Sequence, residues 1–167
     1  MSTQSTQDLN QFCVTRGLVY RSEIGTTIAL AATGVYYVGL VTGAAPIAIL
    51  SRAYSSSESP LSVDLFEATF TDGTPVRTFN RKLSGPPTPP AQFIGGVTQG
   101  TLGAVITGVT LRAPAANGTA QVSIQADDNM LILKPSTSYV IRFTNGGGVN
   151  AVIGASIDMR LVLPSEL

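Results

Sequence analysis

Short runs in which apolar and polar residues alternate follow one another along most of the chain. In residues 61–66, Leu61, Val63 and Leu65 fall on one side of an extended strand, and the residues between them fall on the other. Similar runs predict further strands at residues 17–24, 26–31, 35–41, 47–54, 101–112, 120–125, 130–134, 139–144 and 151–163. No window of a dozen residues keeps a period of 3.6 without Gly or Pro, so no helix is predicted.

About ten short strands at this spacing predict an all-β fold, an antiparallel β-sandwich or jelly roll. Residues 1–14 are rich in Ser, Thr and Gln and predict a flexible or extended N-terminal arm. Residues 15–167 have the length of one β-sandwich domain. Within it, residues 85–90 form a Pro-rich linker that cannot lie inside a sheet. The linker is expected to separate the first group of strands from the second.

The dipeptide Asp72-Gly73 is the strongest local turn signal in the chain. Asp-Gly supplies the positive φ angles that tight turns need. We therefore predict that residues 61–70 and 75–83 pair as a hairpin around it.

Residues 24–51 contain no charge, and a hydropathy window could read them as a membrane-spanning helix. Four glycines, one proline and several β-branched or aromatic pairs break the segment and favour strands separated by turns. The N-terminus also lacks the basic start and apolar run of a secretory signal. We expect the protein to be synthesised in the cytoplasm and not to associate with a membrane.

Charged residues make up only 12% of the chain, about half the usual share, whereas hydrophobic residues make up 44%. A surface with so little charge is expected to be covered by sister subunits or by another partner. Ten Lys and Arg balance ten Asp and Glu, and the arginines are scattered along the sequence. No direct contact with nucleic acid is therefore expected.

The residues that carry most enzyme chemistry are missing. The chain has no histidine and one cysteine, Cys13, which excludes a disulfide within the chain and the common zinc sites. Carboxylate pairs such as Asp64 with Glu67 leave glycoside hydrolysis open, although this pair falls on opposite faces of a regular strand. The run at 127–129, Asp-Asp-Asn, has oxygen ligands that suit calcium, but it better fits a turn. We expect no enzyme activity, no metal site and no cofactor.

Several stretches resemble virion structural proteins of tailed bacteriophages, in particular small jelly-roll head decoration (cement) proteins. The stretches are YYVGL at 36–40, RAY at 52–54, VDLFE at 63–67, TFNR at 78–81, LKPSTSY at 133–139 and RFTN at 142–145. The last strand, residues 151–163, lacks the aromatic and acidic ending of such proteins. The resemblance implies a homodimer or homotrimer in the virion that binds the major capsid protein, or another virion protein, and stabilises the assembled capsid.

The interaction residues predicted for this role lie in the arm, in the linker and on one tyrosine pair. They are Ser2, Leu9, Phe12, Pro86, Pro87, Pro89, Pro90, Tyr36 and Tyr37. The arm and the linker have backbone polar groups that need partners outside their own sheet, so both are expected to contact a partner. Two alternatives remain open: a tail or fibre structural component, and a carbohydrate- or receptor-binding β-sandwich module that would use tyrosines for stacking.

Overall fold

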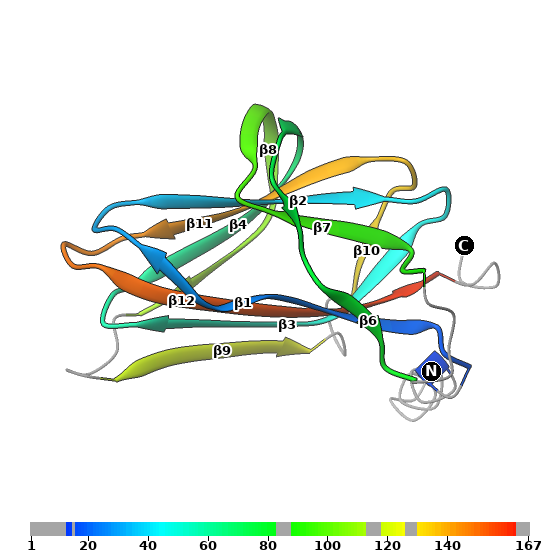
Figure 1. Ribbon diagram of the computed structural model, residues 1–167, viewed down its shortest axis with the longest axis horizontal. Helices are drawn as coiled ribbons and strands as arrows, with labels where there is room; N and C mark the ends of the chain where they lie inside the picture. The colour runs from blue at the N-terminus through cyan, green and yellow to red at the C-terminus, as the bar shows by residue number, and fades with distance from the viewer. Residues whose placement is uncertain (1–12, 15, 83–87, 113–117, 126–129, 163–167) are drawn as a thin grey trace.

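The computed structural model describes residues 13–14, 16–82, 88–112, 118–125 and 130–162 (Figure 1). Helical backbone is confined to Cys13 and Val14 among these residues, and the rest forms strands, turns and connections. The strands are β1 (Val19–Leu30), β2 (Val35–Thr42), β3 (Ile47–Ser57), β4 (Leu61–Thr71), β5 (Thr74–Pro75), β6 (Thr78–Asn80), β7 (Ala91–Gly95), β8 (Thr98–Leu111), β9 (Thr119–Gln125), β10 (Leu131–Leu133), β11 (Ser138–Asn145) and β12 (Ala151–Leu161).

The strands form two antiparallel sheets of six that face each other across the core (Figure 1). Sheet A has the order β10-β3-β12-β1-β6. β9 also pairs with β3, on the same side as β10 and further along the strand. Sheet B has the order β5-β7-β2-β11-β4-β8. Eight of these strands form the rows β1-β12-β3-β9 and β2-β11-β4-β8, and the chain crosses between sheets at most steps. This is the arrangement of a jelly roll. The predicted β-sandwich or jelly roll is confirmed, with twelve strands among the described residues in place of about ten.

The insertion between β4 and β8 corrects one local prediction. Asp72 and Gly73 have φ angles of 59° and 98°, so the predicted turn forms. The strands on its two sides do not pair with each other: β4 pairs with β11 and β8, β5 pairs with β7, and β6 pairs with β1. The hairpin prediction was wrong because a turn signal specifies reversal of the chain, whereas strand partners are chosen by burial elsewhere in the fold.

The core lies between the sheets and follows the predicted alternation. Leu61, Val63 and Leu65 point inward and are buried with Tyr139, Ile141 and Phe143 of the adjacent β11. The uncharged residues 24–51 form the end of β1, all of β2 and the first half of β3. In the part of the chain that is described, no helix has both the length and the apolar character needed to cross a membrane.

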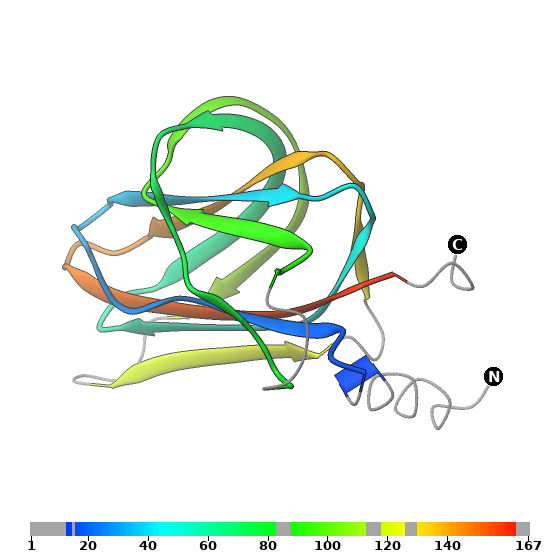
Figure 2. The ribbon, with the colours of Figure 1, turned by 45° about the vertical axis from the view of Figure 1, so that its right-hand side comes forward.

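A second, smaller cluster covers the outer face of sheet B. It consists of Phe66, Ala68 and Val140, with Tyr37, Phe70 and Leu102 packed against them. The pairing of β4 with β8 is interrupted by irregularities between residues 65 and 70, and the two strands curve together above the sheet (Figure 2). This curved ribbon brings Phe70 over Gly39 of β2, where a Cβ atom would lie 2.5 Å from the phenyl ring.

Arg142 closes the open side of this outer cluster. Its guanidinium lies 4.7 Å from the centroid of the Phe66 ring, and its Nη2 atom lies 2.8 Å from Oδ2 of Asp64. A stacked and paired guanidinium shields the ring while its charge remains compensated. The outer face of β4, which carries Asp64 and Phe66, is therefore partly buried.

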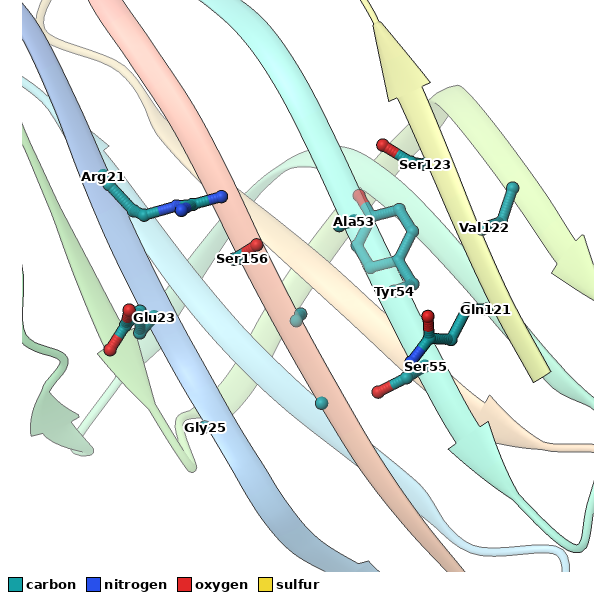
Figure 3. Close-up of a pocket in the computed structure, with 12 residues that line it drawn as sticks. Arg21, Glu23, Gly25, Ala53, Tyr54, Ser55, Gln121, Val122, Ser123 and Ser156 are labelled. Carbon is teal, nitrogen blue, oxygen red and sulfur yellow. The ribbon is translucent and has the colours of Figure 1, made fainter. Parts of the chain in front are cut away.

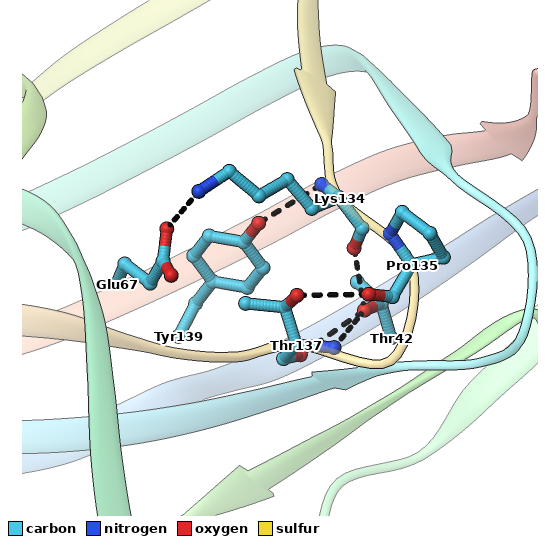
Figure 4. A network of polar contacts seen from close by, with 6 residues as sticks. All are labelled: Thr42, Glu67, Lys134, Pro135, Thr137 and Tyr139. Carbon is cyan, nitrogen blue, oxygen red and sulfur yellow. Dashed lines mark hydrogen bonds and ion pairs between the residues drawn. The ribbon is translucent and has the colours of Figure 1, made fainter.

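The turn between β10 and β11 joins the two sheets through a network of polar contacts (Figure 4). The Thr42 hydroxyl lies 2.7 Å from the carbonyl oxygen of Lys134, to which it donates, and accepts a hydrogen bond from the Thr137 amide at 2.9 Å. The main-chain amide of Lys134 donates to the Tyr139 hydroxyl at 2.9 Å. The stretch at 133–139 is thus a turn that connects the layers.

Candidate interaction surfaces

A hollow of about 530 Å³ lies on the outer face of sheet A, over strands β1, β12, β3 and β9 (Figure 3). Strand register explains how the residues come together: Ser156 faces Glu23 on one side and Ala53 on the other, and Ala53 faces Ser123. In the next row Ser55 lies between Gly154 and Gln121. Within the hollow, the outward side chains of the two central strands, β12 and β3, are no larger than serine, so the floor is low.

Beside the hollow, Asp158 is 6% exposed and pairs with Arg21, which lines the hollow. One carboxylate oxygen lies 3.2 Å from Nε of Arg21, and the other lies 3.4 Å from Nη1 of Arg81. The Ser51 hydroxyl donates to the same carboxylate at 3.0 Å. Two guanidinium groups thus compensate a carboxylate that would be costly to bury alone.

The hollow offers hydrogen bonds but no obvious catalytic group. Its serine hydroxyls have no histidine to activate them, since the chain contains none. Among the described residues, no three His, Cys, Asp or Glu side chains gather where they could hold a metal ion. Tyr54 borders the hollow, but its ring is buried and packs edge-on against Phe143 at 6.0 Å. The hollow therefore lacks an exposed aromatic ring on which a sugar could stack.

A second surface consists of strands β8, β9 and β10, here called the β8–β10 flank. Within the described residues, β8 pairs only with β4, and both β9 and β10 pair only with β3, so each leaves one side open. The strands have 14, 7 and 3 residues, and none contains Asp, Glu, Lys or Arg. Residues of β8 and β9 line one common pocket, which places the two sheet edges side by side.

Exposed apolar side chains are concentrated on this flank. Val105 is 54% exposed and Ile106 is 40% exposed, and both belong to β8. Ile132 of β10 and Met130 beside it are exposed as well. The opposite sheet edges, formed by β5, β6 and β7, are bordered by charged residues such as Arg77, Arg81 and Lys82. The two flanks therefore differ in charge.

The predicted interaction residues that the structure describes do not gather at one site. Ser2, Leu9, Phe12, Pro86 and Pro87 lie outside the described residues, so their role stays a prediction. Pro89 and Pro90 are half-buried just before β7, and the Pro90 carbonyl accepts a hydrogen bond from Gly43 at 2.9 Å.

The tyrosine pair splits between the two faces of sheet B. Tyr36 packs against the main core, and burial raises the pKa of its hydroxyl, partly opposed by a hydrogen bond with the main chain of Gly96. Tyr37 packs in the outer cluster. Both side chains contribute to packing, and an added role in binding stays a prediction.

The β8–β10 flank was not among the predicted sites, although its main signal was present in the sequence. Residues 83–111 form a long stretch without charge. What the sequence did not show is that β8 lies at a sheet edge, because edge position depends on which strands pair.

No protein-family description matches the chain, and no curated protein sequence matches it either. Its fold is similar to that of several solved structures. PirA has 10% identity and a TM-score of 0.36, with 85% of this chain and 93% of that chain covered. A structure of tomato aspermy virus has 8% identity and a TM-score of 0.33, with 99% and 98% covered. The PRD1 vertex protein P5 has 6% identity and a TM-score of 0.39, with 87% and 96% covered. At these identities and TM-scores the similarities carry no argument about function.

Proposed function

We propose that the chain is a non-enzymatic structural protein that assembles through its β8–β10 flank. Within this class we propose a decoration protein that binds an assembled bacteriophage capsid, with the major capsid protein or another virion protein as its partner. It would be made in the host cytoplasm and reside in the virion as a homodimer or homotrimer.

The observation that carries the proposal is the uncharged open edge of sheet B. An edge strand presents unpaired amide and carbonyl groups, and proteins that work as monomers usually protect such an edge with charges, proline or very short strands. Here β8 has 14 residues without a charge and exposes Val105 and Ile106. Irregular pairing interrupts its first part, whereas residues 107–111 continue in regular register with β4. A partner that covers residues 105–111 would satisfy the open backbone groups of the regular part and bury the side chains of Val105 and Ile106.

The same flank suits a protein that reinforces a shell. A stable contact buries about 800 Å² on each partner, and its centre is usually depleted of charge. The uncharged strands at both sheet edges offer such a centre, with Arg112 exposed at the end of β8 as part of a polar rim. No catalytic residue is needed for this role.

The alternatives make different demands on the two surfaces. A tail or fibre component would use the flank in the same way, so the particle to which the protein binds must separate it from a decoration protein. A carbohydrate-binding module would use the hollow on sheet A, and that hollow has no exposed ring. We therefore favour assembly over sugar binding.

Light scattering over a concentration series tests assembly between copies. We expect a dimer or trimer for the natural chain and a shift toward monomer for Val105→Lys, which places a charge on the flank. The matched control is Val149→Lys, because Val149 is exposed to a similar degree but lies between β11 and β12. A chain that is monomeric at all concentrations, or equal effects of both variants, would contradict assembly through the flank.

Binding to a particle needs a second measurement. Purified protein is sedimented with shells of the phage whose genome encodes it, and the bound fraction is compared for the natural chain, Val105→Lys and Val149→Lys. The proposal expects co-sedimentation that only Val105→Lys weakens. Absence from heads together with presence on isolated tails would replace the decoration role by the tail role.

A further inference from the structure

One guanidinium faces the space between the sheets and has no carboxylate partner among the residues that the structure describes. Arg52 lies on β3 and is 9% exposed, and its neighbours along the inward face of the strand are Tyr54 and Ser56. The ion pairs among the described residues involve other basic side chains, and none includes Arg52. Its polar contact is with the Tyr54 hydroxyl, whereas a guanidinium has five N–H donors.

A pocket of about 430 Å³ opens beside this group, within the β8–β10 flank. The residues around Arg52 are mostly apolar: Ile106, Thr107, Val109, Ile124, Met130 and Leu131. On its core side Arg52 also borders a void of about 20 Å³, which has room for a single water molecule. Of these two spaces, the pocket at the flank is therefore the one that can hold a larger group next to Arg52.

We propose that this pocket binds a carboxylate that carries an apolar group. A guanidinium binds a carboxylate through two parallel hydrogen bonds, and these are strong where water is excluded. The apolar walls would hold the hydrocarbon next to the carboxylate. Binding would also compensate a positive charge that is costly to keep away from water alone.

Two sources present this chemistry. One is a free acid with a hydrocarbon tail, and the other is an Asp or Glu side chain within an apolar segment of a docked protein. The pocket volume is within the range of small-molecule sites. The inference does not depend on the proposed assembly, because the pocket is present in the single chain.

Titration calorimetry with octanoate tests the first source, and 1-octanol serves as the uncharged control. We expect octanoate to bind the natural chain, octanol not to bind, and Arg52→Met to weaken octanoate binding by about tenfold or more. Arg52→Lys keeps the charge but loses the two-pronged geometry, so it should bind more weakly than the natural chain.

Titration of the blocked peptides Val-Ile-Glu-Ile-Val and Val-Ile-Gln-Ile-Val tests the second source, with binding expected only for the peptide that contains Glu.

Thermal unfolding separates this role from a purely structural one. Because no described carboxylate pairs with Arg52, Arg52→Met should lower the melting temperature only slightly, through loss of the hydrogen bond to the Tyr54 hydroxyl. A large loss of stability in Arg52→Met would assign Arg52 to folding and overturn the proposal. Equal octanoate binding by the natural chain and Arg52→Met, or no binding of either octanoate or the Glu peptide, would overturn it as well. Binding of only one probe would support the pocket and identify the source.

Discussion

The hydroxyl of Ser59 donates a 2.5 Å hydrogen bond to Oδ1 of Asn145, and both side chains are almost completely buried. The Asn145 amide nitrogen donates to the carbonyls of Ala31 and Val149 at 2.9 and 2.8 Å. These partners belong to three different connections, β1 to β2, β3 to β4, and β11 to β12. One side chain therefore holds together three loops at one end of the sandwich.

We predict that Asn145→Ala lowers the free energy of unfolding by about 3 kcal/mol, because several buried donors and acceptors lose their partner at once. Urea unfolding followed by circular dichroism measures the change. Asn150→Ala is the control, since the exposed Asn150 side chain accepts one hydrogen bond, from Ala32, and should cost about 0.5 kcal/mol or less. Equal losses in the two variants would contradict a central role for Asn145.

The polar network at the β10–β11 turn predicts a contrast between a buried hydroxyl and an exposed ion pair. Thr42→Val removes a buried donor and acceptor, so we expect a loss of about 1–3 kcal/mol. The Lys134 ammonium lies 2.7 Å from Glu67 but is 69% exposed, so Lys134→Ala should leave the free energy of unfolding nearly unchanged. Denaturant unfolding of both variants checks the order, and a larger effect for Lys134→Ala would refute it.

The contact between Gly39 and Phe70 predicts overpacking beneath the curved ribbon. A methyl group in Gly39→Ala would collide with the Phe70 ring, so we expect a loss of about 1–3 kcal/mol. The double variant Gly39→Ala, Phe70→Ala tests the cause, because removal of the ring removes the collision. If the second substitution does not reduce the cost of the first, the ribbon does not lie over β2 as described.

The sequence predicted side-chain direction well where the strands are regular. Leu61, Val63 and Leu65 alternate inward as expected, and Asp72-Gly73 forms its turn. Phe66 shows the limit of the pattern: alternation placed it on the outer face, but only the curved ribbon of β4 and β8 explains why it is buried there. That burial depends on pairing between segments that are distant in sequence.

Arg52 shows a second limit. The register between β3 and β12 shifts between Asp158 and Met159, so that Ser51 pairs with Asp158 and Ile49 pairs with Met159. The extra residue on β3, Leu50, reverses the alternation of side chains along the strand. Ile49 and Arg52 are three residues apart and would lie on opposite faces of a regular strand, but here both point inward. A strand with regular alternation would turn Arg52 toward solvent, so the pocket around it could not be predicted from the sequence.

The buried phenol of Tyr54 predicts that stability falls in alkaline solution. Burial raises its pKa from 10.0 to about 12, and the charge of Arg52 and its hydrogen bond only partly oppose the rise. Between pH 10 and 12 the unfolded chain releases the proton while the folded chain keeps it, so the stability that is complete below pH 10 is lost as the pH rises through this window. The loss for this group is about 2–3 kcal/mol. The pKa of Lys134 is also raised, mainly by its hydrogen bond to Glu67, so its effect on stability falls in an overlapping pH range and must be subtracted.

Urea unfolding of the natural chain and Tyr54→Phe at pH 8, 10 and 11.5 isolates the contribution of the tyrosine, and the natural chain should lose more stability than the variant. Parallel curves for the two proteins would show that Tyr54 titrates normally in the folded state.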